Sequence, residues 1–233
     1  MMKILGISGS PRANEKSGVY TLVETVLKNT GYDYELISLR KKTINGCIAC
    51  LGCVKDNVCV VQDDMAPLRE KVIEADAIVF GAPNYYCTMN ATSHAVLERF
   101  FQFRHQAGDL LWGKLAVAVC VGGTTGSFPA DDIEKLFLYN FVETVAKVTG
   151  QGAASCYSCG HGETCAVGIP QLIHGEGVKI TEDMIPDVCK QKDVMDAAVK
   201  AGQELGQRLK EHDRAAVTQA MQAKLMALFG EMI

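Results

Sequence analysis

The stretch Lys3-Ile4-Leu5-Gly6-Ile7-Ser8-Gly9-Ser10-Pro11-Arg12-Ala13-Asn14 decides the fold of this chain. It begins with a short apolar run and continues into a glycine loop rich in hydroxyl groups. A helical pattern of apolar residues starts near Ser17. Backbone N–H groups in such a loop and at a helix N-terminus favour a bound anion. The stretch therefore predicts a strand, a phosphate-binding loop and a helix.

The predicted phosphate-binding loop carries several hydrogen-bond donors. The neutral ones are Ser8, Ser10, Asn14 and Ser17, and Arg12, next to Pro11, adds a charged donor. The spacing matches neither a Walker loop nor a Gly-x-Gly-x-x-Gly loop. The alternative is a plain turn between a strand and a helix, in which Ser17 serves only as the N-cap.

Two more apolar runs predict buried strands, each followed by a loop at the sheet edge where open parallel sheets bind ligands. Residues 77–80 precede Gly81-Ala82-Pro83-Asn84-Tyr85-Tyr86-Cys87, and residues 115–121 precede Gly122-Gly123-Thr124. Pro83 and Tyr85 can face a flat ring, while Asn84 and Tyr86 supply polar groups. The glycines let backbone N–H groups approach a ring closely; without a ligand they would form only a flexible loop. We expect Cys87 to be a small buried residue or a neighbour of the ring.

Alternating strand and helix patterns predict the fold class. Further strands are expected at residues 34–39 and 153–157, and helices at residues 63–75, 92–102 and 131–149. The alternation favours an α/β fold with a doubly wound, five-stranded parallel sheet of flavodoxin-like order 2-1-3-4-5. We expect residues 1–192 to form this domain. Helices within residues 193–233 should pack on the domain or on a partner subunit.

Four cysteines lie close together at Cys47, Cys50, Cys53 and Cys59, within a loop at residues 43–63. Three thiolates at such short intervals can surround a small inorganic core, and a fourth can close the cage. Bacterial ferredoxins hold [4Fe–4S] clusters with a similar run, although their last spacing is shorter. Structural zinc usually takes two separated cysteine pairs. The run therefore predicts a [4Fe–4S] cluster, with zinc or redox thiols as the alternatives.

A second cysteine group lies in an irregular, glycine-rich loop at residues 156–189. It comprises Cys156, Cys159, Cys165 and Cys189, with His161 and His174 nearby. Four cysteines could hold a second cluster, and three cysteines with a histidine could hold structural zinc. The alternative is a loop of free thiols.

Composition and length bound the remaining possibilities. The chain has 233 residues, a net charge of −4 and 48% hydrophobic residues, which is ordinary for a globular protein with a sizeable core. Its charge does not favour nucleic acid or an anionic membrane as a partner. No apolar run is long enough to span a membrane, and the N-terminal run is too short for a signal peptide. We therefore expect a cytoplasmic protein, where ten cysteines serve as ligands, redox thiols or buried small residues.

The glycine loop Gly6-Ile7-Ser8-Gly9-Ser10-Pro11-Arg12, the loop at residues 81–86 and the four-cysteine run together resemble the iron–sulfur flavoproteins. These belong to the NADPH-dependent FMN reductase group of flavodoxin-like proteins. The resemblance covers about residues 1–210, and the four-cysteine run is its most specific part. It implies FMN and one [4Fe–4S] cluster per subunit, a homodimer or homotetramer, and electrons accepted from ferredoxin in an anaerobe.

The resemblance also implies roles for individual residues. The FMN phosphate would be held by Ser8, Ser10, Arg12, Asn14 and Ser17. The isoalloxazine ring would be lined by Pro83, Asn84, Tyr85 and Tyr86, with residues 122–124. The second cysteine group departs from the pattern, because ordinary FMN reductases lack it.

Three functions follow from these observations. The first is electron transfer between a one-electron carrier and a two-electron acceptor, through a cluster and FMN. The second is an NAD(P)H-dependent flavin or quinone reductase whose cysteines bind zinc. The third is a redox-sensing module without turnover. The basic triplet Arg40-Lys41-Lys42 is either a solvated strand end or a docking patch for an acidic carrier such as ferredoxin.

Overall fold

The structure, a computed structural model, describes residues 2–106 and 108–232. Its centre is a parallel sheet of β1 (Lys3–Ser8), β2 (Asp33–Ser38), β3 (Ala77–Tyr85), β5 (Leu115–Gly122) and β6 (Glu143–Gln151). These strands lie in the order β2-β1-β3-β5-β6, which confirms the predicted flavodoxin-like order. A short sixth strand, β4 (Thr88–Met89), pairs antiparallel with the end of β3.

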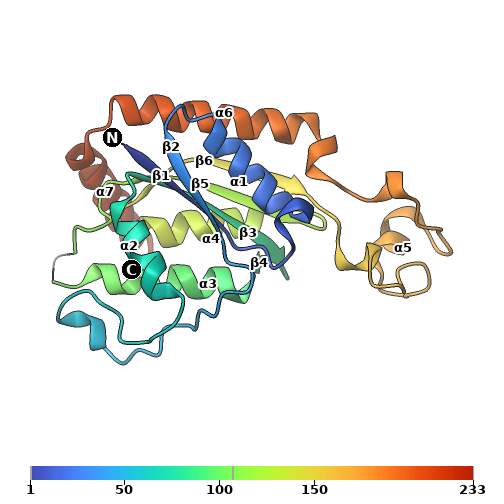
Figure 1. Cartoon of the computed structure of the whole chain (residues 1–233), viewed down its shortest axis with the longest axis horizontal. Coiled ribbons are helices and arrows are strands. Elements are labelled where there is room, and N and C mark those ends of the chain that lie inside the picture. Colours follow the sequence, from blue (N-terminus) through green and yellow to red (C-terminus); the bar gives the residue numbers. More distant parts are fainter. Residues whose placement is uncertain (1, 107, 233) are drawn as a thin grey trace.

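Helices cover both faces of the sheet (Figure 1). One face carries α1 (Gly18–Lys28) and α6 (Lys192–Lys210), and the other carries α2 (Met65–Glu74), α3 (Ala91–Glu98) and α4 (Ser127–Leu138). Successive side chains of a strand point to opposite faces. In β3, therefore, Ile78 and Phe80 join the core under α2, α3 and α4, while Ala77 and Val79 join the core under α1 and α6.

The predicted helix at residues 131–149 is wrong, and so is the strand predicted at 153–157. The chain leaves α4 after Leu138, turns at Phe141 with a left-handed φ of 53°, and enters β6. Thr144, Val145, Val148 and Thr149 are β-branched and suit a strand better than a helix. Residues 155–157 form one 3-10 turn. The turn before β6 was missed because it contains neither glycine nor proline.

The helix predicted at residues 92–102 changes character half-way. After α3 ends at Glu98, the chain continues as a 3-10 segment, Arg99–Arg104. Within it Arg99, Phe100, Gln102 and Phe103 are buried. This segment lies under the loop at residues 43–63, which is termed the cysteine loop below.

The C-terminal helices return over the sheet. Helix α6 packs on α1 and β6, and two glycines permit the close approach of α6 to α1. A Cβ atom at Gly202 or Gly206 would collide with the carbonyl oxygens of Val26 and Thr30. Helix α7 (Arg214–Met232) buries Val217 and Leu225 but exposes Met226, Leu228 and Phe229.

Residues 152–190, termed the lobe, leave the sheet after β6 and return at α6. They contain α5 (Ile169–His174) and several 3-10 turns, and they project beside the sheet (Figure 1). Among the described residues, no helix combines the length and the apolar character needed to cross a membrane.

Candidate functional site: a cleft at the carboxyl edge of the sheet and a cysteine loop

A cleft of about 630 Å³ opens at the carboxyl ends of β1, β3 and β5. Its volume lies in the range of ligand-binding pockets. Most of the residues predicted to hold a cofactor line it: Ser10, Pro11, Arg12, Ser17, Pro83, Asn84, Tyr85, Tyr86, Gly122 and Gly123. The three strand-end loops therefore converge on one cavity, as their positions in the sequence predicted.

Four predicted residues lie outside the wall of this cleft: Ser8, Asn14, Cys87 and Thr124. Ser8 is fully buried at the end of β1. Cys87 is exposed in the tight turn between β3 and β4, with a φ of 63°, so its predicted burial is wrong. The two-residue turn leaves no room for burial because Tyr85 and Thr88 pair directly across it. Tyr86, beside it, is fully exposed.

The glycine loop, residues 9–17, is held from below. The Gly9 amide donates to the Gly81 carbonyl oxygen at 2.7 Å, and the Asn90 side-chain amide donates to the Gly9 carbonyl oxygen at 2.9 Å. Ser17 caps α1 by accepting from the Tyr20 amide at 3.1 Å. The loop is thus fixed to β3 and α3 on one side, and its outer face borders the cleft.

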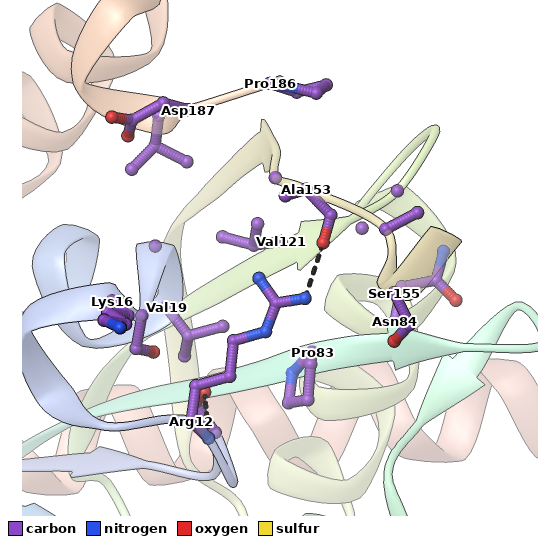
Figure 2. Close-up of a pocket in the computed structure, with 18 of the residues that line it drawn as sticks. Arg12, Lys16, Val19, Pro83, Asn84, Val121, Ala153, Ser155, Pro186 and Asp187 are labelled. Carbon is purple, nitrogen blue, oxygen red and sulfur yellow. Dashed lines mark hydrogen bonds between the residues drawn. The ribbon is translucent and has the colours of Figure 1, made fainter. Parts of the chain in front are cut away.

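Arg12 reaches across the cleft (Figure 2). Its Nη2 atom donates to the Ala153 carbonyl oxygen at 2.7 Å, which joins the glycine loop to the start of the lobe. The guanidinium carries further N–H donors that this bond does not use. A phosphate at the loop can therefore gain a charge-assisted partner from Arg12.

Asn84 presents an unused acceptor at the other side of the cleft. Its Nδ2 atom donates to the Thr125 carbonyl oxygen at 2.5 Å, while its buried Oδ1 atom has no partner among the described residues. A buried acceptor without a donor is costly. A ligand that carries an N–H group fits this position, and a flavin ring carries one.

The lobe supplies the wall that sequence reasoning missed. Residues 152–156, Ile169 and residues 185–189 complete the cleft, and Cys156 and Cys189 are among them. Burial raises the pKa of the Cys189 thiol, and the Asp187 carboxylate raises it further. The available signals, a glycine-rich loop and Pro186, indicated irregular backbone but not where that backbone would lie.

The four cysteines of the cysteine loop differ in exposure. Cys53 is buried, Cys47 and Cys59 are half-buried, and Cys50 is exposed. Ala49 and Leu51 have left-handed φ values of 52° and 59°, which curl the backbone between the thiols. This curl is what a short run of ligands needs to surround one centre.

The cysteine loop fits a thiolate-bound cluster by its donor set. Burial raises the pKa of the Cys53 thiol, and the nearby thiols of Cys59, Cys47 and Cys50 raise it further. All three thiols are thus electrostatic neighbours of Cys53. Within residues 2–106 and 108–232, however, no three histidine, cysteine, aspartate or glutamate side chains converge closely enough to hold a metal ion. The same holds for Cys156, Cys159, Cys165 and Cys189.

A family model described as NADPH-dependent FMN reductase matches residues 2–155. The chain belongs to this family. An iron–sulfur flavoprotein of Methanocaldococcus jannaschii is 31% identical over 150 residues, covering 63% of this chain and 76% of that protein. One of Archaeoglobus fulgidus is 32% identical over 126 residues, covering 54% of this chain and 56% of that protein. The chain is thus an FMN-dependent oxidoreductase related to the iron–sulfur flavoproteins.

Solved structures agree on the fold of this oxidoreductase. RosB has a TM-score of 0.61 at 15% identity, covering 96% of this chain and 88% of its own. The Trp repressor binding protein from Bacillus subtilis has a TM-score of 0.55 at 17% identity, covering 85% and 98%. At such low identities the likeness shows the flavodoxin-like fold alone.

Proposed function

We propose that this oxidoreductase holds FMN in the cleft and a [4Fe–4S] cluster on the cysteine loop, and passes electrons from ferredoxin or a similar carrier to a two-electron acceptor. The observation that carries the proposal is the cysteine loop itself. It contributes four thiols from one curled segment, and Cys53 has the other three as electrostatic neighbours. The kinship with iron–sulfur flavoproteins supports the same assignment.

The residues of the cleft divide the work of binding FMN. Arg12, Ser17 and the N-terminus of α1 favour the negative phosphate. Asn84 offers Oδ1 to an N–H group of the ring, and Gly122 and Gly123 allow close approach by backbone. When bound, FMN supplies chemistry in one- or two-electron steps, which lets it connect a one-electron centre to a two-electron acceptor.

The test is to purify the protein without oxygen and to measure iron, labile sulfide and FMN per chain. We expect four iron, four sulfide and one FMN, with an absorbance that dithionite bleaches. Cys53→Ser should lose iron and sulfide but keep FMN. The Cys156→Ser/Cys159→Ser double variant is the matched control and should keep the first cluster; any iron or zinc that it loses belongs to a second site. Absence of labile sulfide in the wild-type protein would contradict the cluster.

A second candidate function is an NAD(P)H-dependent FMN or quinone reductase without a cluster. It is favoured by the observation that no metal-binding group converges among the described residues. Rapid reduction of bound FMN by NADPH, in protein without sulfide, would select it. The ferredoxin partner, the homodimer or homotetramer and the cytoplasmic location stay predictions.

A further inference from the structure

Both ends of the cysteine loop hang from one helical segment. The Cys47 amide donates to Glu98 Oε2 at 2.8 Å, and the Cys59 amide donates to Gln102 Oε1 at 3.1 Å. Glu98 closes α3 and Gln102 lies one turn further, in the 3-10 segment. The first and last cysteines of the run are therefore positioned by two neighbouring side chains, of which one carries a charge and the other does not.

Arg99 fixes the backbone on both flanks of the loop. Its buried guanidinium donates to the Asn45 carbonyl oxygen at 3.0 Å, to Asp63 Oδ2 at 2.9 Å and to the Val61 carbonyl oxygen at 3.3 Å. The Gln102 side chain donates in turn to the Arg99 carbonyl oxygen at 3.0 Å. Glu98 is therefore presented to the loop by a rigid support.

The Glu98 carboxylate sits close to the loop backbone and keeps its charge. A Cβ atom at Gly46 would lie 2.8 Å from Glu98 Oε2, so the absence of a side chain at position 46 makes room for it. Within the described chain, Glu98 takes part in none of the ion pairs. Its negative charge is thus offset by no basic side chain at the point where it meets Cys47.

We infer that Glu98 is a positioning residue that lowers the reduction potential of the cluster. The inference rests on the proposed cluster. The potential of a thiolate-bound cluster depends on net charge, on hydrogen bonds to sulfur and on exposure. An unpaired carboxylate beside a ligand disfavours the gain of an electron. It also accepts the Cys47 N–H, which would otherwise be free to point at sulfur.

Glu98→Gln tests this, because glutamine keeps an acceptor for the Cys47 amide and removes the charge. Cluster reduction is followed by its absorbance and paramagnetic resonance at an electrode with mediators, which supply one electron per cluster. The reduced-to-oxidised ratio at a fixed potential should rise at least threefold; a tenfold rise corresponds to 59 mV for one electron. The rise should shrink in 1 M salt, since Glu98 is exposed.

Two further variants make the test sharper. Gln102→Glu places a carboxylate at the other anchor and should lower the ratio. Glu24→Gln removes an exposed carboxylate from α1, on the opposite face of the sheet, and should leave it unchanged. A full cluster with an unchanged ratio in both Glu98→Gln and Gln102→Glu overturns the inference. A wild-type protein that takes up no cluster overturns the proposed function instead. If only Glu98→Gln fails to take up the cluster, Gln102→Glu decides.

Discussion

At the scale of single residues, Asn90 shows how a side chain outside the cleft can control what binds in it. Its Nδ2 atom donates to the Gly9 carbonyl oxygen at 2.9 Å, and its side chain is buried. This bond and the one from the Gly9 amide to Gly81 hold both polar groups of a residue in the glycine loop. The loop can then meet a phosphate without being reordered, which lowers the entropy lost on binding.

We predict that Asn90→Leu weakens FMN binding by about tenfold, since one hydrogen bond contributes about 1 kcal/mol. Riboflavin, which lacks the phosphate, should lose much less. Calorimetry of the apoprotein with each flavin measures both. Asn140→Leu is the control, because Asn140 is also buried and donates to a backbone carbonyl, that of Leu136, at the opposite edge of the sheet. Equal losses for FMN and riboflavin would mean that Asn90 serves stability alone.

At the scale of elements, the end of α2 depends on a lysine from the start of β5. The Lys114 ammonium donates to the carbonyl oxygens of Val72, Ile73 and Ala75, at 2.8, 2.5 and 2.5 Å. The last carbonyls of a helix lack donors within it, and a cation there also suits the helix dipole. Lys114 therefore ties α2 to the central sheet.

The lysine also makes stability depend on pH. Burial lowers the pKa of Lys114 to about 8, and the charge of Arg214 lowers it further. Between about pH 8 and 10.5 the unfolded chain binds more protons at this position, so Lys114 contributes more stability as the pH rises.

Lys114→Met should therefore lower the free energy of unfolding by about 1–3 kcal/mol at pH 7, because three carbonyls lose their donor. The deficit should grow by about 2 kcal/mol at pH 9.5. Urea unfolding at both pH values measures this. Lys200→Met, which removes an exposed lysine from α6, should leave both free energies near those of wild type. A deficit that shrinks as the pH rises would contradict the argument.

The elements also show what a sequence can reveal. Periodicity located β1, β3 and β5, because a buried parallel strand is a continuous apolar run between glycine-containing loops. It failed at β6, since the turn before that strand relies on Phe141 in a left-handed conformation. Non-glycine residues rarely adopt this conformation, so nothing in the pattern announced the end of α4. In the same way, loop positions predicted the floor of the cleft, whereas the lobe's path depends on tertiary contacts.

At the scale of the whole molecule, α3 and the 3-10 segment that follows connect the two candidate sites. Asn90 at one end holds the glycine loop, while Glu98 and Gln102 at the other hold the cysteine loop. Figure 1 shows the cysteine loop and β4 at opposite ends of α3. One rigid support therefore sets the position of both loops. The lobe, by contrast, is joined to this framework at few points, and its neck decides how firmly it closes the cleft.

The neck is a reciprocal pair of glutamines. Gln191 accepts from the Gln151 amide at 3.0 Å and donates to the Gln151 carbonyl oxygen at 2.6 Å, which continues the edge of β6 without a further strand. Gln151 also donates to the Gly123 carbonyl oxygen at 3.0 Å, at the floor of the cleft. With the Arg12 bond to Ala153, these contacts fix the lobe as a wall of the FMN cleft.

We predict that Gln191→Ala loosens the lobe and weakens FMN binding by about tenfold or more, since two or three hydrogen bonds are lost. Amide hydrogen exchange should accelerate in residues 152–190 while β1, β3 and β5 stay protected, because local opening leaves the core intact. Gln207→Ala is the control, since Gln207 lies on the same helix and bonds only to Glu211 at its surface. Faster exchange throughout the sheet would show general destabilisation instead, and unchanged exchange in the lobe would show that its wall is held by packing alone.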